Sequence, residues 1–143
     1  MLLARIAEKR GQPDKAIEYL EQAMTTAKAG RIQRLLADAE AVLADAYRTR
    51  GDLKQAERHA MAAVKETQAS GSRFTLPQRF RVLAEILAAQ GRVADADRVY
   101  AQATDIVEGI MVNVPSRTAQ ARLVGVMSQL YAGQFSLAAG PLK

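Results

Sequence analysis

The sequence contains no cysteine and no tryptophan, and it has only three phenylalanines, four tyrosines and one histidine. Without cysteine the chain can form no disulfide and offers no thiolate for metal binding or nucleophilic catalysis. A single histidine also excludes a metal site built from several histidines. Because aromatic and β-branched runs are scarce, a β-sheet is not expected. We therefore predict that the chain is no enzyme and holds neither a cofactor nor a metal.

The sequence also lacks the run of eighteen or more apolar residues that a membrane span requires. The first eleven residues, MLLARIAEKRG, are too short and too soon charged for a secretory signal. We expect no membrane partner. The absence of cysteine suits a reducing compartment, so a cytoplasmic location is predicted.

Positive charge is in excess, with a net charge of +5 and a pI near 9.8. This balance would suit an acidic partner or a nucleic-acid surface. No aromatic stacking pattern or base-reading motif accompanies the arginines, so we do not expect nucleic-acid binding. A basic protein that binds nucleic acid is kept as the last of three hypotheses for function, of which the other two are given below.

A repeated skeleton is the main positive feature of the sequence. LARIAEKRGQPDKAIEYLEQA, LADAYRTRGDLKQAERHAMAA and LAEILAAQGRVADADRVYAQA begin at Leu3, Leu43 and Leu83. Each opens with Leu-Ala, has Gly eight residues later and has Ala thirteen and twenty residues later. Self-similarity at a fixed period indicates a repeat architecture, and this composition, rich in alanine, favours closely packed helices.

Each copy breaks into two helices around its glycine. In the middle copy apolar residues recur at helical spacing over residues 32–50. Gly51 can take the left-handed conformation that ends a helix. Asp52 then predicts an N-cap with Gln55 as its capping-box partner, and the second helix should stop near residues 70–71.

The outer copies follow the same pattern with two differences. In the third, Thr75 and Gln78 predict another capping box, and Pro77 suits a first helical turn. In the first, Met1 falls about two turns before Gly11, so the leading helix is truncated and we expect a piece of a longer protein. The half-helix should leave the second helix incompletely covered and favour a homodimer through this end; the uncovered residues would be Ile17, Leu20 and Ala23.

No fourth repeat follows, because Tyr131 stands where the next glycine would fall. Residues 116–139 instead predict one long amphipathic helix. One apolar face is expected to hold Leu123, Val126, Met127, Leu130, Tyr131 and Ala138, with Val124, Phe135 and Leu137 outside it. We interpret the helix as a cap on the array, or as a surface for a following domain.

The middle copy resembles a tetratricopeptide repeat (TPR), with an alanine, an aromatic residue three further on, the turn glycine and then packing alanines. The positions that carry the resemblance are Ala44, Tyr47, Gly51, Ala56, Ala60 and Ala63, with Gly11 and Gly91 at the other two turns. The resemblance implies an all-α fold, a right-handed α-solenoid of antiparallel helix pairs with about seven helices. The pairs would occupy residues 1–30, 31–71 and 72–111, followed by a loop at 112–115, the capping helix at 116–139 and a tail at 140–143.

The last helix, MSQLYAGQFSLAA, is similar to one that often ends extended repeat arrays in front of CHAT domains, which are bacterial relatives of caspases. This resemblance implies that the chain is a regulatory or recognition segment of a larger signalling protein or protease.

Tetratricopeptide arrays bind peptides or helices in a groove lined by the leading helices of the pairs. Carried onto this sequence, the groove positions are Arg5, Glu8, Lys9, Asp38, Ala41, Asp45, Arg48, Gln78, Arg81, Glu85 and Ala88. Arg48 and Arg81 are the strongest candidates to bind a partner carboxylate, unless they pair with acidic residues of the groove itself.

Other polar residues have ordinary interpretations. Asp38, Glu40 and Asp45 fit the solvent face of a helix, and His59 fits a second helix beside a packing alanine. The first hypothesis for function is therefore a binding module for a protein or peptide partner. A regulatory segment of a larger protein is the alternative.

Overall fold

The computed structural model describes residues 2–113 and 116–139. The predicted tail 140–143 and part of the predicted loop 112–115 lie outside these residues. The described chain is helical and contains no strand, which confirms the all-α class. Its seven helices are α1 (Leu2–Lys9), α2 (Pro13–Ala29), α3 (Gln33–Arg50), α4 (Leu53–Ser70), α5 (Leu76–Ala89), α6 (Val93–Met111) and α7 (Arg117–Ala139).

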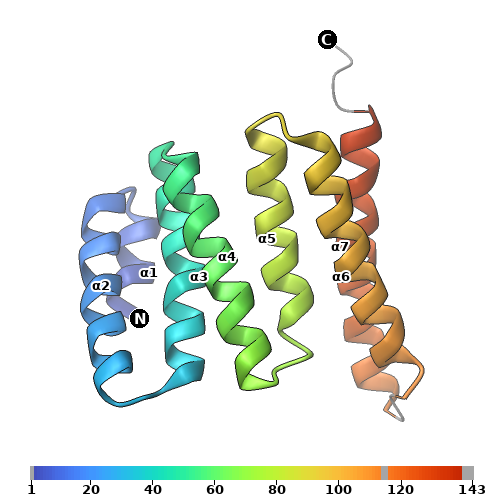
Figure 1. The fold of residues 1–143 in the computed structure, drawn as a ribbon, viewed down its shortest axis with the longest axis horizontal. Helices are drawn as coiled ribbons and strands as arrows, with labels where there is room; N and C mark the ends of the chain where they lie inside the picture. The colour runs from blue at the N-terminus through green and yellow to red at the C-terminus, as the bar shows by residue number, and fades with distance from the viewer. Residues whose placement is uncertain (1, 114–115, 140–143) are drawn as a thin grey trace. The chain divides into compact units, whose positions relative to one another are not determined.

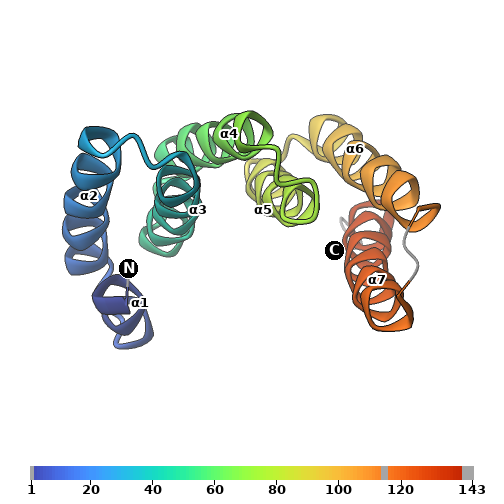
Figure 2. The ribbon, with the colours of Figure 1, turned by 90° about the horizontal axis from the view of Figure 1, so that it is seen from below.

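The helices form two compact units, Met1–Ser72 and Arg73–Lys143, each considered by itself. In the first unit α1 to α4 run alternately up and down (Figure 1). Seen end-on, α1 and α3 lie on one side of this unit and α2 and α4 on the other (Figure 2). Small side chains allow the close approach, since Ala44, Ala46, Ala56, Ala60 and Ala63 are at most 2% exposed.

The short first helix covers the core better than its length predicts. Ile17 and Leu20 of α2 are buried, so the expectation that they are incompletely covered is wrong. The reason is that Ala4 and Ala7 on α1 join them in one cluster with residues of α3. Only Ala23 is half-buried. The large apolar side chains of α1 that are left exposed at this end are Leu2, Leu3 and Ile6.

The turn between α3 and α4 follows the sequence closely. Gly51 ends α3 with φ of 91°, in the left-handed region that an L side chain rarely adopts. The Asp52 carboxylate then accepts a hydrogen bond from the backbone N–H of Gln55 at 3.2 Å. The return bond of a capping box is absent here, because the buried Oε1 atom of Gln55 has no partner among the described residues.

In the second unit α6 packs against both α5 and α7. The capping box predicted at the start of α5 does not form. Thr75 is the N-cap residue but already has helical backbone angles, φ −87° and ψ −25°, and its side chain makes no cap bond. An N-cap side chain reaches the first turn from an extended backbone, so this conformation prevents the bond. Pro77 lies in the first turn of α5 as expected.

The buried face of α7 differs from the predicted one. Leu123 and Leu130 are buried as expected, but Tyr131 and Ala138 are exposed, whereas Leu137 is half-buried. The contact with α6 explains the rotation. A Cβ atom on Gly133 would lie 2.5 Å from the Tyr100 ring, so the backbone of α7 is close to α6 there.

Within the described part of the chain, no helix combines the length and the hydrophobicity needed to cross a membrane.

Candidate functional site

The predicted groove residues of the first unit lie on one face of α3. Asp38, Ala41, Asp45 and Arg48 span about 80° of the helix at 100° per residue, and all four are half-buried. This face is opposite the side that holds buried Leu43. The neighbouring helix α1 contributes Arg5 and Lys9, both exposed; the side chain of Glu8 lies outside the described residues.

Both arginines singled out by sequence have acidic partners on their own helix. Arg48 donates to Asp45 at 2.9 Å, and Arg81 donates to Glu85 at 2.6 Å. Such pairs at three or four residues are the local neighbours expected on a helix. The alternative considered for these arginines, pairing within the predicted groove, is therefore the one observed.

Gln78, a predicted groove position in the second unit, also makes polar contacts. Its Oε1 atom accepts a hydrogen bond from Nε of Arg81 at 2.8 Å, and its Nε2 atom donates to Gln129 of α7 at 3.3 Å. Arg81 is thus held between Gln78 and Glu85. The face that α5 offers is a fixed polar network in which each charge is locally balanced.

Sequence reasoning missed a buried polar cluster between α3 and α4. Nδ1 of His59 lies 2.5 Å from Oε2 of Glu40, and each residue is only 8% exposed. The Tyr47 ring stacks on the imidazole with centroids 5.2 Å apart and planes within 2°. The expectation that Glu40 faces solvent is wrong. Its position four residues after Leu36 and three before Leu43, on the apolar stripe, was the available signal.

This cluster is enclosed by the helix pair and offers no open position for a substrate. It therefore gives no support to a catalytic role for His59. No group of three or more side chains suited to a metal ion occurs in the part of the chain that the structure describes.

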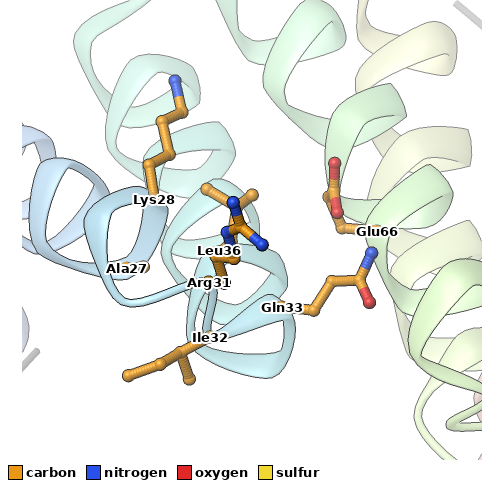
Figure 3. Close-up of a pocket in the computed structure, with 7 residues that line it drawn as sticks. All are labelled: Ala27, Lys28, Arg31, Ile32, Gln33, Leu36 and Glu66. Atoms are coloured by element: carbon orange, nitrogen blue, oxygen red, sulfur yellow. The ribbon is translucent and has the colours of Figure 1, made fainter.

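A pocket of about 360 Å³ lies at the turn from α2 to α3 (Figure 3). Arg31 and Leu36 line it, Lys28 rises from the end of α2, and Gln33 reaches toward the helix that carries Glu66 (Figure 3). The wall is completed by Ala27 and by Ile32, which points away from the other side chains in Figure 3. Nothing in the sequence analysis singled out this pocket.

Arg31 is the only non-glycine residue with positive φ in the described ranges, at 53°. The turns at residues 11, 51, 71 and 91 use glycine for this conformation. Here Gly30 stands next to Arg31 but has φ of −85° instead. A Cβ atom on Gly30 would lie 3.3 Å from the end of the Ile32 side chain, which is a tight contact. The left-handed conformation costs a non-glycine residue about 1–2 kcal/mol.

Comparison with known proteins identifies the repeat. Residues 1–34 match the model of a tetratricopeptide repeat family. The chain contains a tetratricopeptide repeat. The matched segment comprises α1, α2 and the turn into α3, so most of the pocket wall, from Ala27 to Gln33, belongs to this repeat. The second and third helix pairs share the skeleton of this tetratricopeptide repeat at forty-residue spacing.

Among solved structures, BtubC (BKLC) from P. vanneervenii is similar to this chain. The TM-score is 0.71 at 18% sequence identity, and the match covers 99% of this chain and 58% of BtubC. At this identity the likeness shows the fold alone. The chain spans 58% of the length of BtubC. No match was found among curated proteins.

Proposed function

We propose that the chain is a non-catalytic module that binds an extended peptide or a helix of a partner protein. The observation that carries this proposal is the face of α3 formed by Asp38, Ala41, Asp45 and Arg48. These side chains are half-buried and Arg48 is already held by Asp45, so the surface loses little side-chain freedom on binding. The tetratricopeptide repeat supports the same conclusion, because the family implies an interaction scaffold in general terms.

The pairing of arginines with carboxylates favours a polypeptide over nucleic acid as the partner. Arg48, Arg81 and Arg92 each pair with a carboxylate, which removes cations from the set that could contact phosphates. A nucleic-acid surface instead concentrates unpaired lysine and arginine side chains.

The alternative is that the same surface belongs to the regulatory segment of a larger signalling protein or CHAT-type protease. In that case the partner would be another domain of the parent protein, and α7 would be its capping or docking helix. The sequence of the parent reading frame tests this alternative directly. The cytoplasmic location stays a prediction.

Selection of displayed random dodecapeptides on the whole 143-residue chain tests the proposed function. A matched variant reverses the face while keeping its ion pair: Asp45→Arg with Arg48→Asp. The expected result is a set of peptides that bind the native chain and lose about tenfold in affinity on the swapped variant.

The control is a second swap in the same unit, Asp14→Arg with Arg50→Asp. These two exposed side chains form an ion pair of 3.2 Å between α2 and α3, and the pair lies outside the α3 face. Its affinity for the same peptides should stay unchanged. Failure to enrich any peptide, or equal loss on both swapped variants, would contradict the proposed function.

A further inference from the structure

The pocket at the turn from α2 to α3 is lined by charged side chains that have no partner within the protein's described residues. Among the described residues the side chains of Lys28, Arg31 and Glu66 form no hydrogen bond or ion pair. This contrasts with Arg48 and Arg81, which are paired on their own helices. Two cations and one anion leave the wall with a net charge of +1.

The backbone conformation of Arg31 supports a role for its side chain. Glycine is used at the other four positions of positive φ, but the chain has an arginine in this one. The guanidinium has no acidic partner within the described residues, and its side chain is one of those that line the pocket (Figure 3). Unfavourable backbone conformations that persist in a folded protein are concentrated at functional sites.

We propose that this pocket binds the carboxylate side chain of an acidic residue in a partner polypeptide, next to an apolar residue. The inference rests on the proposed function and names the chemistry of the partner. Arg31 can hold a carboxylate with two parallel hydrogen bonds, and Lys28 adds a second positive charge. Leu36, which is half-buried, supplies apolar surface for the neighbouring side chain.

The other polar groups set the selectivity. One carboxylate neutralises the net charge of the wall, whereas Glu66 would repel the second charge of a phosphate group. The Gln33 amide can both donate to and accept from the peptide backbone beside the acidic residue. A volume of about 360 Å³ is at the lower end for ligand pockets and suits one or two side chains.

The test is a titration of the ¹⁵N-labelled full chain, followed by amide chemical shifts. The probe is a blocked tetrapeptide with glutamate and leucine between two glycines. It should give saturable shifts at Ala27, Arg31, Gln33 and Leu36. The same blocked peptide with glutamine in place of glutamate should bind about tenfold more weakly. The glutamine peptide with a free C-terminal carboxylate should also bind about tenfold more weakly than the glutamate probe.

Arg31→Gly separates binding from folding, because glycine adopts positive φ without strain while the guanidinium is lost. We expect the glutamate probe to bind this variant and Lys28→Gln at least about fivefold more weakly. The control is Arg34→Gln, which removes an equally exposed cation from the same end of α3 outside the pocket wall.

Three results would overturn the inference: unchanged affinity of Arg31→Gly, equal affinity for the glutamate and glutamine probes, or tighter binding of the free C-terminal carboxylate. The dodecapeptide selection distinguishes failure of the proposed carboxylate pocket from failure of the proposed function. If selected peptides bind the native chain and Arg31→Gly equally, the module stands and the pocket is not its carboxylate site.

Discussion

His59 on α4 and Glu40 on α3 form a buried pair, with Nδ1 and Oε2 2.5 Å apart and both side chains 11% exposed. Tyr47 stacks against the imidazole and extends the contact along α3. Because the pair is enclosed among alanines that pack at short range, each polar group depends on the other for its hydrogen bond. The register of this helix pair is therefore coupled to one polar contact.

Removal of one member of this pair should destabilise the first unit. Glu40→Ala or His59→Ala leaves a buried polar group without its partner, which costs about 3 kcal/mol. The double substitution Glu40→Leu with His59→Leu should cost much less, because apolar residues can replace both partners together. Urea unfolding followed by circular dichroism measures the three free energies.

The exposed ion pair of Arg50 and Asp14 is the control for this measurement. With side chains 52% and 79% exposed, it is screened by water, and Asp14→Ala should cost less than 1 kcal/mol. Equal losses for Glu40→Ala and Asp14→Ala would show that the buried pair contributes no more than a surface contact.

The contact between α6 and α7 predicts opposite effects for two glycines of the same helix. Gly133→Ala places a methyl group against the buried ring of Tyr100 and should destabilise the second unit by about 1–2 kcal/mol. Gly125→Ala meets no atom within 4 Å and should stabilise α7 by about 0.5–1 kcal/mol. Thermal unfolding of both variants checks the prediction, which a rise in melting temperature for Gly133→Ala would contradict.

The backbone conformation of Arg31, in the α2–α3 turn, predicts that removing its side chain increases the stability of the folded chain. Arg31→Gly relieves the left-handed conformation and should raise the free energy of unfolding by about 1 kcal/mol. Gly51→Ala is the reverse change at φ of 91° and should lower it by about 1 kcal/mol. If Arg31→Gly destabilises the chain instead, the side chain makes a stabilising contact that outweighs its backbone strain.

The turns show why much of the fold was predictable from sequence. Gly51 marks the end of α3 because almost no other residue adopts its conformation at low cost, and Asp52 caps α4 through a bond between residues three apart. Signals of this kind are local, so the residue type and its neighbours are enough to read them.

Features that depend on packing between helices were not predictable in the same way. Glu40 was assigned to solvent because a carboxylate is rarely buried, but His59, nineteen residues away, satisfies it. Likewise no residue-type signal marks the positive φ of Arg31, because glycine takes this conformation at the other four turns. The pocket around Arg31 depends on the backbone conformation of this turn and on packing between helices, so it could not be derived from the periodicity of the sequence.

The charge pairing also predicts weak contact with nucleic acid despite a pI near 9.8. Arg48, Arg81 and Arg98 have carboxylate partners, so these three arginines are less available to displace counterions from a phosphate backbone. We expect no shift of a double-stranded DNA or RNA probe at physiological salt. Binding that weakens steeply as salt increases would favour the nucleic-acid hypothesis instead.

The most direct measurement of the central claim is the affinity of the best selected dodecapeptide for the native chain and for the variant Asp45→Arg with Arg48→Asp. Fluorescence anisotropy of the labelled peptide gives both constants under the same conditions. The proposed function predicts saturable binding to the native chain and about tenfold weaker binding to the variant. Equal affinity for the two proteins would show that the α3 face does not bind the partner.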